Sequence, residues 1–324
     1  MFSVKIVKNL VLVIQLLFLR KKLGGFNMKH MKCLMFTFVA FLLIVGCGPA
    51  ETPEETPGDD TAPAEDVGDQ SITFGMTPWT STIPPTTIAM LILEDMGYEV
   101  NQIEADAGGV YTGLSRGDID AFMDAWLPDM HASYMEQFGD NIDSTSVSYP
   151  DGELGWVIPT YVEEVNSLED LKGNEDLFGG EMYGIEEGAG MTLTSRDMIE
   201  DLDLDLDYVA SSEGGMLAQV ARQIGGDRPV LFLGWRPHPM FVDYDLKVLE
   251  GQEEYFATSE VHVLTNVDFQ ERVPEAYEFL SNWSIDVGDI EQMIVEIDGG
   301  RSAEEVAREW IDNNQDKVAE MKGE

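Results

Sequence analysis

From residue 71 onward, short apolar segments alternate with longer segments in which apolar residues recur every three or four positions. The short segments favour β-strands and the longer ones favour amphipathic helices. The predicted strands cover residues 71–76, 99–105, 119–126, 154–162, 183–186, 207–212 and 229–235. The clearest helices are predicted at 86–98, 108–118, 191–201 and 213–226, and helices continue from residue 273. Strands that alternate with helices predict an α/β fold with mostly parallel sheets.

The first 46 residues have a different pattern, with seven Lys or Arg and no Asp or Glu. Their second apolar run follows a basic patch and ends at Val45-Gly46-Cys47. This pattern predicts a signal peptide with a lipobox, in which residues 1–27 are an upstream extension and Met28, not Met1, is the start. The alternative is a transmembrane anchor, although an apolar core of about a dozen residues is short for one.

Cys47 would then be the lipidated first residue of an extracytoplasmic, membrane-anchored protein. The segment 51–70 has eight acidic residues, three prolines and no aromatic residue. It cannot bury a core, so residues 47–70 are predicted to be a disordered tether. The mature chain would contain no further cysteine, which excludes disulfides and cysteine-based metal or nucleophile sites.

Charge narrows the choice of partners. Removing the seven basic residues of the leader takes the formal net charge from −42 to −49. Such a charge argues against nucleic acid and anionic lipid surfaces as partners. Spread along the whole chain, it is typical of a halophilic protein, because concentrated salt screens the self-repulsion.

Three tryptophans follow or end predicted strands. Trp126 lies in the stretch DAWLPDMH, where Pro128 ends the strand. The ligands of open parallel sheets bind beyond the carboxyl ends of the strands, so three indoles there would form an aromatic box. Such a box suits a quaternary ammonium group. One tryptophan at a strand end is usually part of the core, so the shared position is the informative feature. The three strand-end tryptophans are Trp79, Trp126 and Trp235; Trp156, Trp283 and Trp310 are predicted to pack in the core.

The stretch Gly188-Ala189-Gly190-Met191 lies between a predicted strand and a predicted helix. Free N–H groups at a helix start attract an anion, although the stretch is also compatible with an ordinary turn. His131 could donate a hydrogen bond to the same anion. No P-loop, G-x-S-x-G or H-E-x-x-H pattern is present, and His131 and His238 lack a third metal ligand nearby in sequence. The sequence therefore predicts no enzyme, no cofactor and no metal.

With these residues in place, the chain from about residue 72 to 321 resembles the glycine betaine-binding proteins of bacterial ABC importers, the OpuAC-like family. The motifs that carry the resemblance are LEDMGYEV, AWLPDMH, VNSLEDLKG, GIEEGAGM, GWRPHPMF and NNQDKV, in the order of that family. The resemblance implies a two-lobed periplasmic-binding-protein fold of type II with the ligand in the cleft between the lobes. It implies one lobe of residues 71–158 plus 262–324 and another of 159–261.

The resemblance also implies roles for individual residues. Trp79, Trp126 and Trp235 would enclose the ammonium group, and His131, Gly190 and Met191 would bind the carboxylate. An ABC permease and its ATPase would be the partners in the membrane. The chain departs from common family patterns at Thr80, Tyr111 and Pro239, which leaves the choice among ligands open. Glycine betaine or proline betaine is expected, choline or ectoine is the alternative, and a secreted choline-ester hydrolase is a more distant one.

Overall fold

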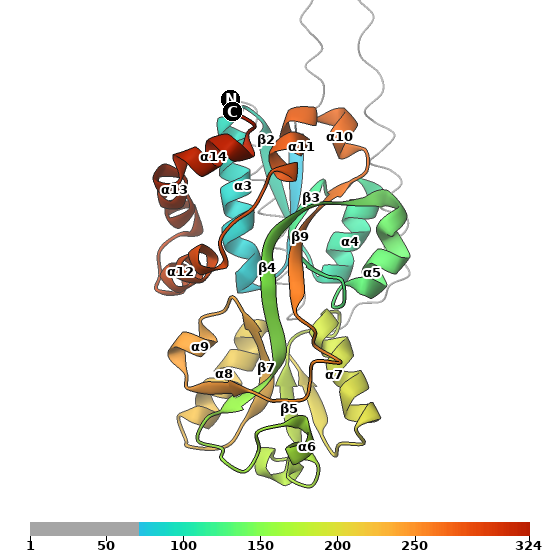
Figure 1. Cartoon of the computed structure of the whole chain (residues 1–324), viewed down its shortest axis with the longest axis vertical. Helices are drawn as coiled ribbons and strands as arrows, with labels where there is room; N and C mark the ends of the chain where they lie inside the picture. Colours follow the sequence, from blue (N-terminus) through green and yellow to red (C-terminus); the bar gives the residue numbers. More distant parts are fainter. Residues whose placement is uncertain (1–70) are drawn as a thin grey trace, which may run out of the picture. The chain divides into compact units, whose positions relative to one another are not determined.

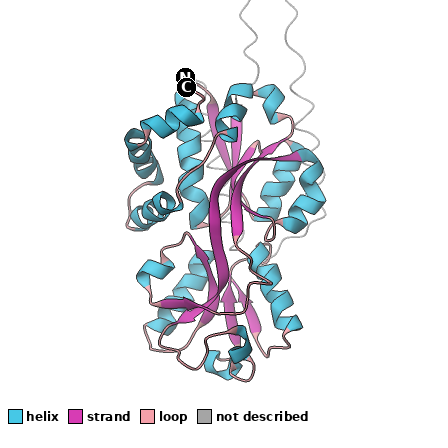
Figure 2. Ribbon diagram, viewed as in Figure 1, coloured by secondary structure: helices cyan, strands magenta, loops and turns pink. Residues whose placement is uncertain are grey.

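The computed structural model describes residues 71–324. The predicted signal peptide, the lipidation site at Cys47 and the acidic tether lie outside the described residues. The strands form two sheets joined by one long strand, β4 (Ile142–Pro159). Figure 1 shows β4 running from one sheet into the other, and Figure 2 shows helices around both sheets.

The first sheet has the strand order β2-β1-β3-β9-β4. β1 (Ser71–Met76) is parallel to both of its neighbours, β2 (Glu99–Glu104) and β3 (Ala121–Leu127). β9 (Ser259–Asn266) is antiparallel to β3 and to β4. We call this sheet and its helices the first lobe. The helices are η1 (Thr80–Thr82), α3 (Ile83–Asp95), α4 (Ala107–Arg116), α5 (Ala132–Phe138), η2 (Gly139–Asn141), α10 (Phe269–Arg272), α11 (Pro274–Ser281), α12 (Val287–Asp298), α13 (Ala303–Asn313) and α14 (Gln315–Met321).

The second sheet has the order β4-β7-β5-β6, and β8 (Leu246–Val248) pairs with β4. β5 (Glu181–Gly184) is parallel to β6 (Asp207–Ala210) and to β7 (Leu231–Arg236). We call this sheet and its helices the second lobe. The helices are α6 (Leu168–Leu171), η3 (Glu175–Phe178), α7 (Gly190–Asp201), α8 (Glu213–Ile224) and α9 (Met240–Asp243).

The structure adds two features to the predicted pattern. β9 and the first part of β4 were not predicted, and both bring antiparallel pairing into sheets that otherwise contain the expected parallel pairs. The pairing of β4 changes from β9 to β7 between Gly152 and Glu153. The two sheets therefore meet inside β4, whereas the predicted limit at residue 158 lies near its end.

Local sequence signals explain where several elements begin and end. Asp106 caps α4 by accepting a hydrogen bond from the Gly109 N–H, and Gly117 ends the helix in the left-handed conformation, which glycine adopts without strain. Ser302 caps α13 in the same way as Asp106 caps α4. These caps fix the ends of helices whose apolar faces cover the sheets. None of the helices in residues 71–324 has both the length and the apolar content needed to cross a membrane.

The three tryptophans predicted to pack are buried, as expected. Each indole N–H has an acceptor within 2.9 Å, which removes the cost of burying an unpaired donor. The pairs are Trp156 with Ser195, Trp283 with Ser148 and Trp310 with Asp289.

Candidate ligand-binding site

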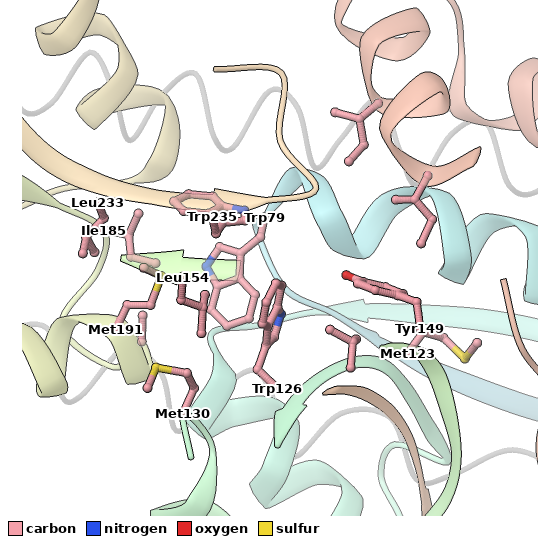
Figure 3. Close-up of a cluster of buried hydrophobic side chains, with 14 of the residues drawn as sticks. Trp79, Met123, Trp126, Met130, Tyr149, Leu154, Ile185, Met191, Leu233 and Trp235 are labelled. Carbon is pink, nitrogen blue, oxygen red and sulfur yellow. The ribbon is translucent and has the colours of Figure 1, made fainter. Parts of the chain in front are cut away.

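The three strand-end tryptophans line one pocket between the lobes. Trp79 follows β1 and Trp126 lies near the end of β3, both in the first lobe, whereas Trp235 lies near the end of β7 in the second. Figure 3 shows their rings close together, with apolar side chains beside them. The pocket, about 340 Å³ including its open mouth, is also lined by Ser81, Met130, His131, Leu154, Ile185, Ala189, Gly190 and Met191.

The lining has an unusual chemical composition for so acidic a protein. Among the described residues that line the pocket, none is Asp, Glu, Lys or Arg. Its polar groups are the Ser81 hydroxyl, the His131 imidazole, the indole N–H groups and the backbone. No cluster of three or more potential metal ligands exists among residues 71–324. The pocket therefore offers ring faces and a few neutral donors to a small molecule.

His131 precedes α5 and is 2% exposed. Its Nδ1 accepts a hydrogen bond of 3.1 Å from the Trp126 N–H, so the proton of the neutral ring lies on Nε2. Burial lowers the pKa of His131 to about 3, which keeps the ring neutral at physiological pH. The imidazole stacks on Trp79 with 5.8 Å between ring centroids. His131 thus presents a fixed, neutral Nε2–H donor within the pocket.

The turn from β5 to α7 supplies backbone donors on the opposite side. α7 begins at Gly190, and the first N–H groups of a helix have no acceptor within it. Gly190 lies directly against the first lobe, because a Cβ added there would be 2.1 Å from the carbonyl oxygen of Met130. Only glycine allows this approach of two backbones. The structure thus brings all six predicted ligand-binding residues into one pocket.

Asp124 is a buried carboxylate beneath this pocket that sequence reasoning did not single out. It is fully buried and accepts hydrogen bonds from the Ser81 hydroxyl at 2.8 Å, the Thr82 hydroxyl at 2.7 Å and Trp126 Nε1 at 3.0 Å. Burial raises the pKa of Asp124, and these three hydrogen bonds act in the opposite direction. An acid within β3, whose other residues are apolar, was the available signal.

Three hydrogen bonds join the lobes around the pocket. Trp79 Nε1 donates to Glu186 Oε1 at 2.8 Å, and the Thr80 N–H donates to Glu213 Oε2 at 3.1 Å. The Tyr134 hydroxyl donates to the Gly188 carbonyl at 2.7 Å. The lobes are therefore in contact on both sides of the pocket, in a closed arrangement.

His238, in the motif GWRPHPMF, supports this arrangement from behind. Its Nε2 is 3.1 Å from Glu213 Oε1, its Nδ1 accepts the Met240 N–H, and its ring meets the edge of Trp235. His238 thus fixes Glu213 and Trp235 at the same time and lies outside the pocket lining.

With this geometry established, a comparison with known families is informative. Residues 70–313 match the family described as the substrate binding domain of ABC-type glycine betaine transport systems, OpuAC. The chain belongs to this family. Its members are transport substrate-binding domains, and the family is not one of enzymes.

Individual relatives agree with this family. The glycine betaine/carnitine transport binding protein GbuC of Listeria monocytogenes is 34% identical over 140 residues, which span 42% of this chain and 47% of GbuC. The match thus covers about half the length of that relative.

Solved structures match over a larger share of the chain. Lactococcal OpuAC in its closed form with glycine betaine has a TM-score of 0.74 at 27% identity, over 78% of this chain and 99% of that one. An ABC-transporter choline binding protein in complex with choline has a TM-score of 0.74 at 26% identity, over 79% and 92% of the two chains. This chain has the two-lobed type II periplasmic-binding-protein fold of these relatives.

Proposed function

We propose that this protein is the extracytoplasmic receptor of an ABC importer and that it captures glycine betaine, or the related proline betaine, for uptake as an osmoprotectant. The observation that carries the proposal is the pocket itself. Three indoles from both lobes surround a space whose lining contains no ionisable side chain except a neutral histidine. A cation without N–H donors gains from ring faces and loses little by leaving water-like hydrogen bonding.

The two ends of the ligand would take different partners. The trimethylammonium group would lie among Trp79, Trp126 and Trp235. The carboxylate would accept hydrogen bonds from His131 Nε2 and from the N–H groups of Gly190 and Met191, which offsets its desolvation. Its partners come from both lobes, so a bound ligand stabilises the closed state.

The delivery system completes the proposal. The receptor would pass its ligand to a permease and ATPase in the membrane, tethered by a lipid at Cys47. The acidic composition supports a function in concentrated salt. These parts rest on family membership and on the sequence of residues 1–70.

A calorimetric panel tests the ligand. Glycine betaine, proline betaine, choline and ectoine are titrated into the protein, and a carboxylate-bearing betaine is expected to bind tightest with one site per chain. Tighter binding of choline or ectoine would reassign the ligand within the same fold. Saturable binding of none of the four, by a protein shown to be folded, would refute the proposal, and turnover of acylcholines would favour a hydrolase.

A further inference from the structure

Two indole N–H groups of the pocket donate to carboxylates. Trp126 Nε1 donates to Asp124 Oδ1 at 3.0 Å, and Trp79 Nε1 donates to Glu186 Oε1 at 2.8 Å. Neither carboxylate is among the residues that line the pocket, so each lies behind the ring that it contacts. Each of these rings therefore stands between the pocket and an acid.

We propose that Asp124 and Glu186 are selectivity residues, which orient Trp126 and Trp79 and add negative charge behind them so that the pocket favours a positively charged group. The inference rests on the proposed function, because it assumes a quaternary ammonium ligand. The attraction of a cation to a ring comes from the negative potential of the ring face. An anion at the N–H polarises the indole in the same direction and adds its own Coulomb attraction.

The charge on Asp124 has no basic partner. It is fully buried, its partners are two hydroxyls and an indole, and it forms no ion pair among the described residues. Because the surroundings have a low dielectric constant, its field reaches the pocket with little screening. Its bond to Trp126 lies within one strand, so this contribution is present whether the lobes are open or closed.

Glu186 differs because its bond crosses between the lobes. Trp79 belongs to the first lobe and Glu186 to the turn before α7 in the second, so the bond exists only when the lobes are closed. The second oxygen of Glu186, Oε2, is buried and has no hydrogen-bond partner. The next residue, Glu187, is neutralised by an ion pair of 2.6 Å with Arg196. Of these two neighbouring acids, only Glu186 contacts the pocket and lacks a basic partner.

This difference provides a matched pair of variants. Glu186→Gln removes the charge but keeps an oxygen that can accept the Trp79 N–H. Glu187→Gln removes the same charge one residue away, with no contact to the pocket. Asp124→Asn is the corresponding variant for Trp126, and its thermal unfolding is measured first because the residue is fully buried. Where Asp124→Asn does not fold, the Glu186 variant alone decides.

Three probes separate charge from shape. Tetramethylammonium carries the positive charge without a carboxylate. 3,3-Dimethylbutanoate has nearly the shape of glycine betaine but a neutral carbon in place of nitrogen. Glycine betaine carries both charges. Affinities are measured by calorimetry for the wild-type protein and each variant.

Glu186→Gln is expected to weaken tetramethylammonium binding about three- to tenfold, as the loss of one nearby charge implies. It should weaken glycine betaine less and should leave 3,3-dimethylbutanoate unchanged or bound more tightly. Glu187→Gln should change each affinity by less than about twofold, because that charge is exposed and already paired.

Equal losses for all three probes in Glu186→Gln would overturn the inference, because Glu186 would then only shape the pocket. Equal effects of Glu186→Gln and Glu187→Gln would overturn it too, since the field would be diffuse. Both results leave the proposed function intact if the wild-type protein binds glycine betaine. A folded wild-type protein that binds neither glycine betaine nor tetramethylammonium would refute the proposed function and, with it, the inference.

Discussion

A single added methyl group at Gly190 should separate ligand binding from folding. Gly190 begins α7 in the second lobe, and the backbone of Met130 in the first lobe lies against it. In Gly190→Ala the new Cβ would be 2.1 Å from the Met130 carbonyl oxygen and 2.8 Å from its carbonyl carbon. A backbone carbonyl cannot rotate away as a side chain can. The lobes must therefore move apart wherever they are closed.

The size of the effect follows from this distance. Real Cβ atoms stay at least 3.0 Å from such neighbours, so the contact must open by about 1 Å. The Tyr134–Gly188 and Trp79–Glu186 hydrogen bonds, at 2.7 and 2.8 Å, would stretch toward the limit of useful geometry. Forced overpacking typically costs about 1–3 kcal/mol. Glycine betaine should therefore bind about five- to 150-fold more weakly.

Calorimetry and thermal unfolding of Gly190→Ala test this prediction together. The unliganded midpoint should change little, because open lobes contain no clash. The N–H of residue 190 remains, so the variant removes closure and not a donor. Gly188→Ala is the matched control in the same turn, since its Cβ would meet only the Tyr134 hydroxyl oxygen at 3.5 Å, an ordinary contact.

Two results would refute the reasoning. Wild-type affinity in Gly190→Ala would mean that the bound state does not need this approach of the two backbones. An equal loss in Gly188→Ala would mean that the turn tolerates no side chain at all, whichever residue faces Met130. Small-angle scattering of the liganded variant adds a direct check, because a blocked closure should leave a larger radius of gyration than in the liganded wild-type protein.

Three further predictions concern side chains of the pocket. Replacing a cage tryptophan with Ala should weaken glycine betaine about tenfold or more in calorimetry, as the loss of a partly desolvated cation–π contact implies, whereas Trp283→Ala should lower the unfolding midpoint instead. His131→Ala should cost glycine betaine about 1.5–3 kcal/mol but choline much less, and equal losses would show that His131 only shapes the pocket. Because the folded pKa of about 3 lies below the unfolded value of about 6.5, the unfolded chain binds the extra proton and His131 reduces stability as the pH falls below about 6.5. Urea unfolding of His131→Gln should lack this part of the slope, up to about 1.4 kcal/mol per pH unit, and an unchanged slope would mean that His131 titrates normally. The cage variants are Trp79→Ala, Trp126→Ala and Trp235→Ala.

The sequence locates the pocket because its main residues follow simple local rules. Pro128 ends β3 one residue after Leu127, and the glycines before α7 mark a tight turn. Trp79, Trp126 and Trp235 each follow or end an apolar run, so their shared position could be recognised without a structure. The carboxyl ends of these strands face the same cleft because the fold is α/β.

The strands β4 and β9 could not be predicted in full. The first part of β4, residues 142–153, is mostly polar and has no apolar run that would identify it. It is extended because β9, more than one hundred residues later in sequence, provides its hydrogen-bond partners. A strand stabilised by distant pairing has a weak local signal. The crossing between the lobes depends on these two strands, so the lobe limits were harder to predict than the pocket.

The carboxylates behind the cage were missed for a different reason. With 61 Asp and Glu in the chain, an acidic residue carries little information by itself. Asp124 was recognisable in hindsight, because it interrupts an apolar strand. Glu186 was not, because its importance comes from an indole on the other lobe. Contacts that form only on closure are invisible to any pattern along the chain.

The same contacts indicate how a small ligand could control closure. Each of the three hydrogen bonds between the lobes is replaced by a bond to water when the lobes open, so each contributes only about 0.5–1.5 kcal/mol. Moving an equilibrium from 1% to 99% closed requires about 5.5 kcal/mol of preference for the closed state. Three cation–π contacts at about 0.5–2 kcal/mol each, with one hydrogen bond to a charged group at about 1.5–3 kcal/mol, reach that value. The ring faces alone fall short over most of this range. A zwitterion held at both ends should therefore close the lobes more completely at saturation than a cation of similar size without a carboxylate.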